Sequence, residues 1–234
     1  MFQTDPFSLI VLFVGLSLLP FVAMVATSYL KIVVVMSLIR NALGIQSIPP
    51  NMVVNALAMI LTFYIMAPFA SESWDIVKRE MAEKQAVEAR AQGKSAAGAS
   101  SGAAFYDTDV VTKAAEPFRK FLSDHVSDRE RAFFVNTAER LWGKDGESAN
   151  VASDSFYILL PSFCVSELTK SFQIGFLVYL PFIAIDIIVS NILLAMGMMM
   201  VSPVTISLPF KLLLFVMVNG WTLLIQGLVR GYVI

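Results

Sequence analysis

Charged residues are scarce in this chain, and cysteine and histidine occur only once each. Charged side chains make up 15% of the 234 residues, whereas an ordinary soluble domain carries about a quarter. The single cysteine, Cys164, excludes an intrachain disulfide, and we expect it to serve as a small buried hydrophobic side chain. The formal net charge of −1 provides no attraction for nucleic acid. Instead, 57% of the residues are hydrophobic and the mean hydropathy is +0.71, which indicates a membrane protein.

Recognisable catalytic motifs are also missing. The sequence has no Gly-rich phosphate loop before a helix, no GxSxG, no HExxH and no Cys/His metal cluster. His125 stands beside Asp124 and Asp128 in a polar stretch, where we expect a surface histidine rather than a catalytic base. Asp186 is the one acid well inside an apolar run, and an intramembrane aspartyl protease needs two. We therefore predict that the protein is not an enzyme and uses no cofactor or metal.

The few charges are segregated along the chain. Residues 72–154 hold 15 Asp and Glu and 12 Lys and Arg, which leaves eight charged residues elsewhere. This pattern predicts an N-terminal apolar hairpin over 1–71, a polar helical insert over 72–154 and a C-terminal apolar hairpin over 155–234. Within the insert, the stretch near 84–104 becomes rich in Ala, Gly and Ser, which is typical of a flexible linker. The N-terminus lacks a positive segment, so we expect no cleavable signal peptide.

The apolar segments predict an all-α, membrane-associated fold class built from helical hairpins. The first segment is longer than the roughly 20 residues that cross a bilayer, and Pro20 inside it predicts a kink or a break. Further interruptions are expected at Pro161 and Pro181, and Pro68 lies near the predicted end of the second helix. Hydropathy gives four spans, with both termini on one side. The apolar stretches are 6–30, 52–70, 155–165 with 172–200, and 204–229.

The connection at residues 31–50 orients the chain. It carries Lys31 and Arg40 and no acid, so the positive-inside rule places it in the cytoplasm. Gly44 can take the positive φ that ends a helix, and Asn51 can cap the next one. The polar insert then lies on the opposite side, which in a bacterium is the periplasm.

The insert itself predicts helices. We expect them over 75–90, 113–125 and 128–142, with Ser127 and Glu130 at capping-box spacing before the last. Gly143 follows the final apolar pair and marks the end of that helix. The apolar residues could form a small core within the insert or pack on a neighbour. These are Phe118, Phe121, Leu122, Phe133, Phe134, Leu141 and Trp142.

Two charges lie where an apolar segment should have none. Asp186 and Lys211 each interrupt a hydrophobic run, and an isolated charge at mid-bilayer costs about 3 kcal/mol on insertion scales. Their midpoint falls in a methionine-rich turn, so a chain reversal there would bring them to similar depth. We predict a buried charge pair, within one chain or across an interface; the alternative is that each faces water separately. Glu167 and Lys170 have i, i+3 spacing, which fits a surface pair or an interface pair equally.

The turn between those charges is the most unusual stretch of the chain. It reads Met196-Gly197-Met198-Met199-Met200-Val201-Ser202-Pro203. A Ser-Pro reversal normally comes with small polar residues, whereas methionine side chains are long, soft and polarizable. The pattern predicts a deformable hairpin tip that closes on an object of variable shape. The alternative is that the methionines only pack the tip of the hairpin.

Two stretches of the chain carry recognisable motifs. The first runs from Arg40 through Asn41-Ala42-Leu43-Gly44-Ile45-Gln46 to Ile48-Pro49-Pro50-Asn51-Met52. The second runs from Ile174 through Tyr179-Leu180-Pro181-Phe182, Asp186 and the methionine turn to Thr205-Ile206-Ser207-Leu208-Pro209-Phe210-Lys211 and Gly220-Trp221. Both stretches resemble the FliP/SctR (YscR-like) family of core export-apparatus proteins in bacterial type III secretion systems. The resemblance covers roughly 6–74 and 115–232. The residues near Arg40 and Gln46 resemble the virulence-type injectisome branch more than the flagellar branch.

The resemblance implies a structural role in protein transport. Family members form a pentamer that joins smaller S and T subunits in a helical export gate of the bacterial inner membrane. The gate passes unfolded protein substrates through a central lumen, which a methionine gasket narrows; here the gasket residues would be Met198, Met199 and Met200. The apparent transmembrane helices would then pack largely against other subunits, so that Asp186 and Lys211 lie in protein rather than lipid.

Three other functions are alternatives to an export gate. An ion or small-solute channel or transporter subunit would line its path with Asp186 and Lys211. A membrane-bound enzyme is disfavoured, because the sequence lacks a catalytic set. A pure assembly scaffold would not contact the passing substrate.

Overall fold

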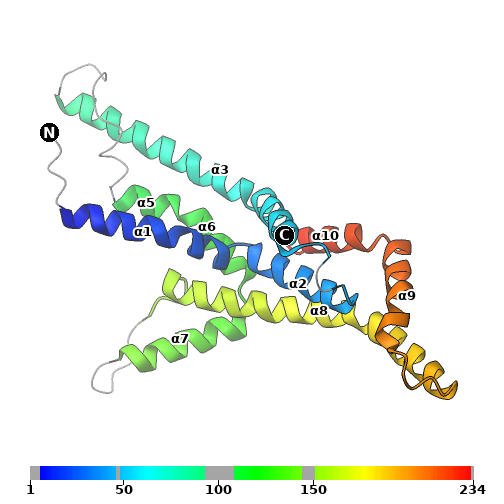
Figure 1. Cartoon of the computed structure of the whole chain (residues 1–234). Helices are drawn as coiled ribbons and strands as arrows, with labels where there is room; N and C mark the ends of the chain where they lie inside the picture. Colours follow the sequence, from blue (N-terminus) through cyan, green and yellow to red (C-terminus); the bar gives the residue numbers. More distant parts are fainter. Residues whose placement is uncertain (1–5, 46–47, 93–107, 144–150, 233–234) are drawn as a thin grey trace. The chain divides into compact units, whose positions relative to one another are not determined.

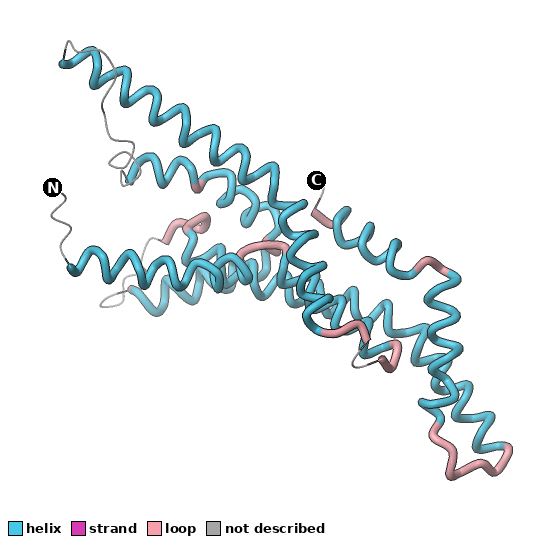
Figure 2. The backbone as a smooth tube through the Cα atoms, turned by 45° about the horizontal axis from the view of Figure 1, so that its top comes forward, coloured by secondary structure: helices cyan, strands magenta, loops and turns pink. Residues whose placement is uncertain are grey.

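The computed structural model describes residues 6–45, 48–92, 108–143 and 151–232, and within these ranges the chain forms helices and no strand. Figures 1 and 2 show the helices and their connections. The predicted all-α fold class is therefore confirmed. The helices are α1 (Pro6–Val25), α2 (Tyr29–Ala42), α3 (Asn51–Gln92), α5 (Thr108–Ala114), α6 (Glu116–His125), α7 (Asp128–Trp142), α8 (Phe156–Ala195), α9 (Pro203–Met217) and α10 (Gly220–Arg230).

Several helices are long and apolar enough to cross a membrane. Two qualify on their own in the described part of the chain, at Asn51–Lys84 and Phe156–Ala195. Two further spans are possible if each bent pair counts as one, namely α1 with α2, bent by 55°, and α9 with α10, bent by 59°. The four predicted spans are therefore matched only if each bent pair counts as one span beside the two unbroken helices.

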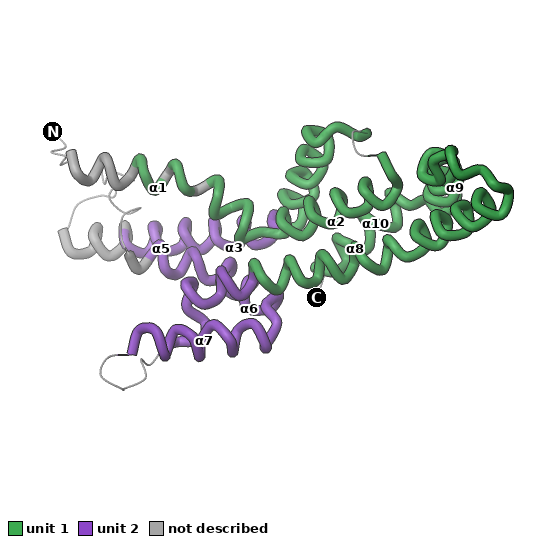
Figure 3. Tube along the Cα trace, turned by 60° about the horizontal axis from the view of Figure 1, so that its bottom comes forward, with its two compact units in different colours: residues 1–65, 164–234 green, residues 66–163 purple. Residues whose placement is uncertain are grey.

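The chain divides into two compact units, coloured separately in Figure 3. Unit 1 combines residues 1–65 with 164–234, and unit 2 comprises residues 66–163. Both long helices contribute to both units, because α3 continues past residue 65 and α8 begins before residue 164. The insert predicted over 72–154 falls within unit 2, and most of the linker predicted near 84–104 lies outside the described residues.

The prolines do not interrupt the helices as predicted. Pro68 lies inside the 42-residue α3, and Pro161 and Pro181 lie inside the 40-residue α8. Each proline removes one backbone donor, but an apolar segment gains nothing from exposing the remaining backbone groups, so the helix continues on both sides. Pro20 likewise lies within α1.

The break in the first segment occurs at residues 26–28 instead. There the Thr27 hydroxyl donates a hydrogen bond to the Ala23 carbonyl at 2.6 Å. Such a side-chain bond to the preceding turn bends helices and offers the backbone an alternative to the regular ladder. The helix therefore bends at its hydroxyl residues rather than at its proline.

The core of unit 1 forms around one face of α2. Ile32, Val35, Met36 and Ile39 are at most 1% exposed, and their i, i+3, i+4, i+7 spacing makes a continuous stripe. Gly175 on α8 allows a close approach to this helix, because a Cβ there would overlap the side chain of Leu38. After α2 the chain turns at Gly44, whose φ is 79°. Asn51, predicted as the cap of the next helix, is instead the first residue of α3, and the Pro50 carbonyl accepts from the Val54 N–H.

The core of unit 2 centres on Phe121, which is fully buried. Its ring contacts those of Phe69, Phe163 and His125 at centroid distances of 4.9, 5.7 and 4.6 Å. His125 is 5% exposed, with Nδ1 2.8 Å from the Phe121 carbonyl oxygen, so the prediction of a surface histidine was wrong.

The predicted insert core was only partly right. Phe121 and Leu122 are buried, but three apolar residues of α7 face outward with exposed fractions of 52–73%. Because α7 lies at the periphery of this unit, its apolar positions do not all reach the core. The exposed residues are Phe133, Leu141 and Trp142. As expected, α7 begins after Ser127 and ends before Gly143.

Candidate functional site

The methionine-rich turn is the tip of a helical hairpin made by α8 and α9 (Figures 1 and 2). Helix α8 ends at Ala195, and Gly197 follows with φ 74°. The N–H groups of Gly197 and Met198 donate to the carbonyls of Leu194 and Leu193, each at 3.0 Å. This is the glycine-dependent arrangement that satisfies the last carbonyls of a helix. The chain then reverses and enters α9 at Pro203.

The tip presents its methionine side chains outward. Met199 is 82% exposed and Met200 is fully exposed, while Met198 is 43% exposed. Because these side chains bury little apolar surface within unit 1, they gain little hydrophobic stabilisation there. Contacts that bury these three side chains must therefore come from outside unit 1.

Asp186 and Lys211 meet behind the tip. The Lys211 ammonium lies 2.6 Å from Asp186 Oδ2, and the Ser207 hydroxyl donates to Asp186 Oδ1 at 2.6 Å. Lys211 also donates to the Ala42 carbonyl at the end of α2, at 3.2 Å. The Lys211 side chain is 5% exposed and that of Asp186 is 33% exposed. The cluster therefore ties α8 to α9 and to α2.

A second charged cluster is more deeply buried. Glu167 on α8 is fully buried, and its Oε2 lies 2.9 Å from the ammonium of Lys31 on α2. The Tyr232 hydroxyl donates to the same oxygen, and Lys170 lies 3.4 Å from Oε1. Glu167 and Lys170 are thus close, as their spacing allows, but Glu167 does not belong to a surface pair.

Burial also affects the pKa of the tyrosine hydroxyl in this cluster. Tyr232 follows α10 and is 6% exposed. Burial, and secondarily the neighbouring Glu167 carboxylate, raise the pKa of Tyr232 far above its ordinary value. The hydroxyl therefore remains a donor throughout the physiological pH range, and the Lys31 ammonium lies 3.8 Å from the centre of its ring.

Sequence reasoning missed Lys31, Ser207 and Tyr232 as members of these clusters. Lys31 was assigned to a cytoplasmic turn, whereas its ammonium is buried against Glu167. Arg40, the other cation of that turn, donates to the Pro49 carbonyl at 3.0 Å and fixes the corner before α3. A lone lysine in an apolar helix signals a buried partner, but that partner is 136 positions away and no local spacing reveals it.

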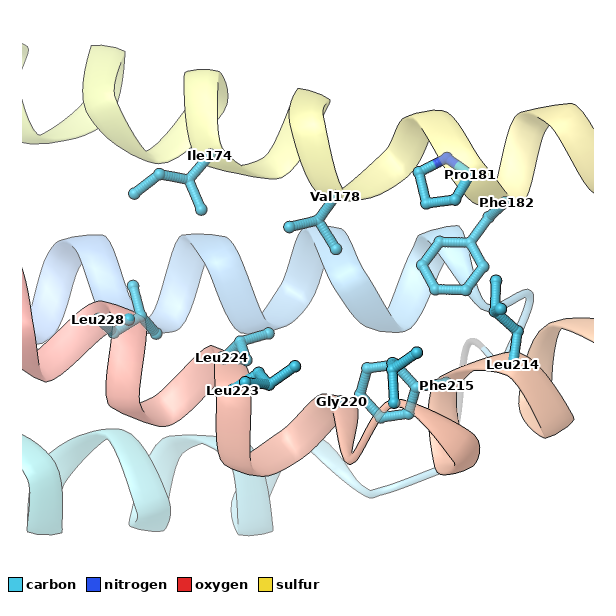
Figure 4. A pocket seen from close by; sticks show the side chains of 12 residues that line it. Ile174, Val178, Pro181, Phe182, Leu214, Phe215, Gly220, Leu223, Leu224 and Leu228 are labelled. Atoms are coloured by element: carbon cyan, nitrogen blue, oxygen red, sulfur yellow. The ribbon is translucent and has the colours of Figure 1, made fainter.

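A cavity lies between α8, α9 and α10. It has a volume of about 560 Å³ and is lined only by apolar residues and glycines of α8, α9 and α10 and of the bend between α9 and α10. Figure 4 shows the side chains that face it. We call this cavity the apolar slot. Among the described residues, no group of three or more His, Cys, Asp or Glu side chains is placed to hold a metal ion.

These features define a class: an all-α membrane protein with two clusters of paired charges inside its apolar unit and a hairpin that ends in methionines. Comparison with known proteins then identifies the family. The chain belongs to the FliP family, which matches residues 12–228.

Several curated relatives cover nearly the whole chain. "Yop proteins translocation protein R" of Yersinia pestis is 49% identical over 228 residues, which are 97% of each protein. "Hypersensitivity response secretion protein HrcR" of Ralstonia nicotianae is 45% identical over 226 residues, 96% of each. "Virulence protein YscR" of Salmonella typhimurium is 43% identical over 231 residues, 97% of each.

These matches confirm the resemblance to the injectisome branch of the FliP/SctR family. The relatives are type III secretion translocation proteins, so this chain is a component of the type III secretion export apparatus. The family is a structural part of inner-membrane secretion machinery, which agrees with the long apolar helices.

Proposed function

We propose that this chain is a pore-forming subunit of the export gate and that its methionine tip seals the lumen through which unfolded proteins pass. The observation that carries this proposal is the exposure of Met199 and Met200, at 82% and 101%, on a turn held at the end of a hairpin. Apolar side chains so fully exposed need a partner surface, and a ring of identical tips provides one.

The chemistry of methionine supports a seal rather than a rigid ring. The thioether side chain has three rotatable bonds and no charge, so it adapts to irregular neighbours. A ring of such side chains can close to ions when idle, because a narrow hydrophobic constriction excludes water. It can then yield to a passing polypeptide whatever the shape of its side chains.

The Asp186–Lys211 pair supports a bracing role for the rest of the hairpin. An ion pair at 2.6 Å, joined by Ser207 and the Ala42 carbonyl, holds α9 against α8 and α2. A soft tip needs such a rigid base, because a passing chain pushes on the methionines. The pair also disfavours the alternative of an ion or small-solute channel, since the two charges already bind each other.

The proposal includes an assembly. By resemblance to the family, we infer that five copies join the S and T subunits in the bacterial inner membrane. We also infer that residues 72–154 lie on the periplasmic side. Exposed apolar surface on unit 1 is consistent with neighbours: Phe172, Phe176 and Leu177 on α8 are 58–66% exposed.

A crosslinking experiment tests the gate directly. A photoreactive amino acid replaces Met199 in cells that carry a secretion substrate with a folded domain that stalls in transit. We expect adducts between position 199 and the stalled substrate. The matched control places the same amino acid at Met217, which is 73% exposed on α9 away from the tip. Assembly of the apparatus without any adduct at position 199 indicates a scaffold instead of a gate.

A further inference from the structure

We propose that residues 220–232, which comprise α10 and the chain up to Tyr232, form a strap that opens away from α8. The strap turns at the bend after α9, and Tyr232 holds its far end closed. The inference does not depend on the methionine seal. It rests on the low burial of α10, on the backbone of the bend and on the contacts of Tyr232.

Helix α10 buries little of its own surface. Its buried residues are Gly220 and Leu228, so Leu228 is the one side chain of this helix inside the core. On α2, by contrast, four apolar side chains along one face are at most 1% exposed. A segment with few buried apolar contacts opens at a lower free energy than the rest of its unit. We therefore expect α10 to open before α2 does.

The apolar slot accounts for this low burial. Ile174 and Val178 on α8 face Leu224 and Leu228 on α10 across it (Figure 4). Side chains that border a cavity lack neighbours on that side and forfeit part of their dispersion attraction. The lining carries no polar side chain, so hydrogen bonds between side chains do not hold α10 against α8 across the slot. The strap is consequently held mainly at its two ends.

The first end of the strap is the bend between α9 and α10. The helix pair is bent there by 59°, and Asn219 takes the left-handed conformation with φ 52°. Asparagine visits this region more readily than most residues with a Cβ, and Gly220 has a freer backbone still. A few such residues at the ends of elements form the hinges of moving segments. The ring of Phe215 lies where a Cβ of Gly220 would be, so the backbone turns against a flat apolar surface.

The second end is held by Tyr232. Its hydroxyl donates to the Glu167 carboxylate on α8, and the Lys31 ammonium on α2 lies 3.8 Å from the centre of its ring. Within the described residues 220–232, no other side chain makes a hydrogen bond. A hydrogen bond to an ionised carboxylate is roughly twice as strong as one between neutral groups. One hydroxyl group therefore contributes much of the attraction that keeps the strap closed.

Opening of the strap leaves the rest of unit 1 intact. The Lys31–Glu167 pair, at 2.9 Å, joins α2 to α8 and includes no atom of α10. Asp186 and Lys211 likewise join α8 to α9. Both pairs persist when Tyr232 leaves, so opening is distinct from unfolding of the unit. Once detached, a helix of 11 residues is marginal in water, so its amide hydrogens exchange with solvent.

The test measures hydrogen exchange of the purified full chain in detergent and of Tyr232→Phe, which keeps the ring and removes the hydroxyl. Mass spectrometry of overlapping peptides reports the exchange rates in α10 and in α2. We expect the amides of α10 to exchange about tenfold faster in Tyr232→Phe, all by a similar factor, because a hydrogen bond to a charged group shifts an equilibrium by at least that much. Exchange in α2 should not change. Tyr64→Phe, 71% exposed on α3, provides the control and should match the wild type.

A second variant tests the slot. Val178→Ile adds one methylene group next to the cavity, which is worth about fourfold in an equilibrium constant when it is buried. Exchange in α10 should slow by about that factor, because the closed strap gains contacts. The control Val216→Ile adds the same group at a position that is 70% exposed on α9 and should have no effect. An α10 exchange rate in Val178→Ile equal to that of the wild type would contradict the role assigned to the slot.

Three results with Tyr232→Phe would overturn the proposal. Unchanged exchange in α10 would mean that the hydroxyl does not hold the strap. A graded acceleration that fades from Arg230 toward Gly220 would mean fraying of the chain end instead of opening about the bend. Equal acceleration in α10 and α2 would mean that unit 1 as a whole is destabilised.

Discussion

Lys31 and Glu167 form an ion pair of 2.9 Å between side chains that are 5% and 0% exposed. The pair joins α2 to α8, two helices separated in sequence by the whole polar insert. A buried pair contributes little net stability by itself, but removing one partner leaves an uncompensated charge in the interior. The main effect of the pair is therefore on the alignment of α2 and α8 in unit 1, since other alignments would leave a buried charge unpaired. Its contribution to the free energy of unfolding is small.

Glu167→Gln should destabilise the protein strongly. The substitution preserves shape but deprives the buried Lys31 of its counter-charge, which costs about 3–5 kcal/mol. The measurement is the thermal midpoint of unfolding in detergent, with the exposed Glu83→Gln as the control. The double variant Lys31→Met with Glu167→Gln should recover most of the loss. A double variant as unstable as Glu167→Gln would show that the unpaired lysine is not the cause.

Asp186 and Lys211 should show coupling in a double-mutant cycle. Asp186→Lys places two cations together, and Lys211→Asp places two anions together, so either reversal should nearly abolish secretion. Exchanging both charges should restore part of it, because the pair reforms in the opposite sense. The expected coupling energy lies between about 0.5 and 3 kcal/mol. If the exchanged pair is as defective as Asp186→Asn alone, the charges do not act as a pair.

Replacing Met198, Met199 and Met200 by Ala should open the idle gate to ions. The shorter side chains widen the constriction and remove the surface that excludes water. The measurement is ion conductance of the intact assembly, in which we expect a severalfold rise. The matched control is a triple Ala variant at exposed methionines outside the tip, Met52, Met59 and Met217. An unchanged leak with assembly intact contradicts the seal.

Much of this fold is readable from sequence, because apolar length and local signals determine it. The end of α2 two residues before Gly44 and the end of α7 before Gly143 follow from single residues. The meeting of Asp186 and Lys211 follows from symmetry about a turn. The sequence does not reveal contacts between distant segments. Glu167 contacts Lys31 and Tyr232 only because α2, α8 and the residues after α10 pack together. The prolines misled for a different reason: in an apolar segment, exposing backbone groups costs more than the one donor that a proline removes.

Tyr232 should confer a pH dependence that phenylalanine lacks. Burial raises the pKa of its hydroxyl in the folded state, while in the unfolded chain it is about 10. Ionisation therefore favours the unfolded chain, and the stability from this group, complete below pH about 10, declines as pH rises further. Above pH about 10, the free energy of unfolding of the wild type should fall by up to about 1.4 kcal/mol per pH unit more than that of Tyr232→Phe. The exposed control Tyr64→Phe should follow wild type, whereas parallel curves for Tyr232→Phe and wild type would contradict a buried hydroxyl.

Gly197→Ala should weaken the hairpin tip without disturbing any packing. A Cβ at Gly197 meets nothing within 4 Å, but φ is 74°, and a residue with a Cβ in this left-handed region costs about 1–2 kcal/mol. The tip should then sample other conformations, so that secretion falls and ion leak rises while the amount of assembled protein stays constant. Gly15→Ala provides the control, because its Cβ is equally unobstructed and it lies in the regular helix α1. Equal behaviour of the two variants would mean that the conformation at Gly197 does not matter for the seal.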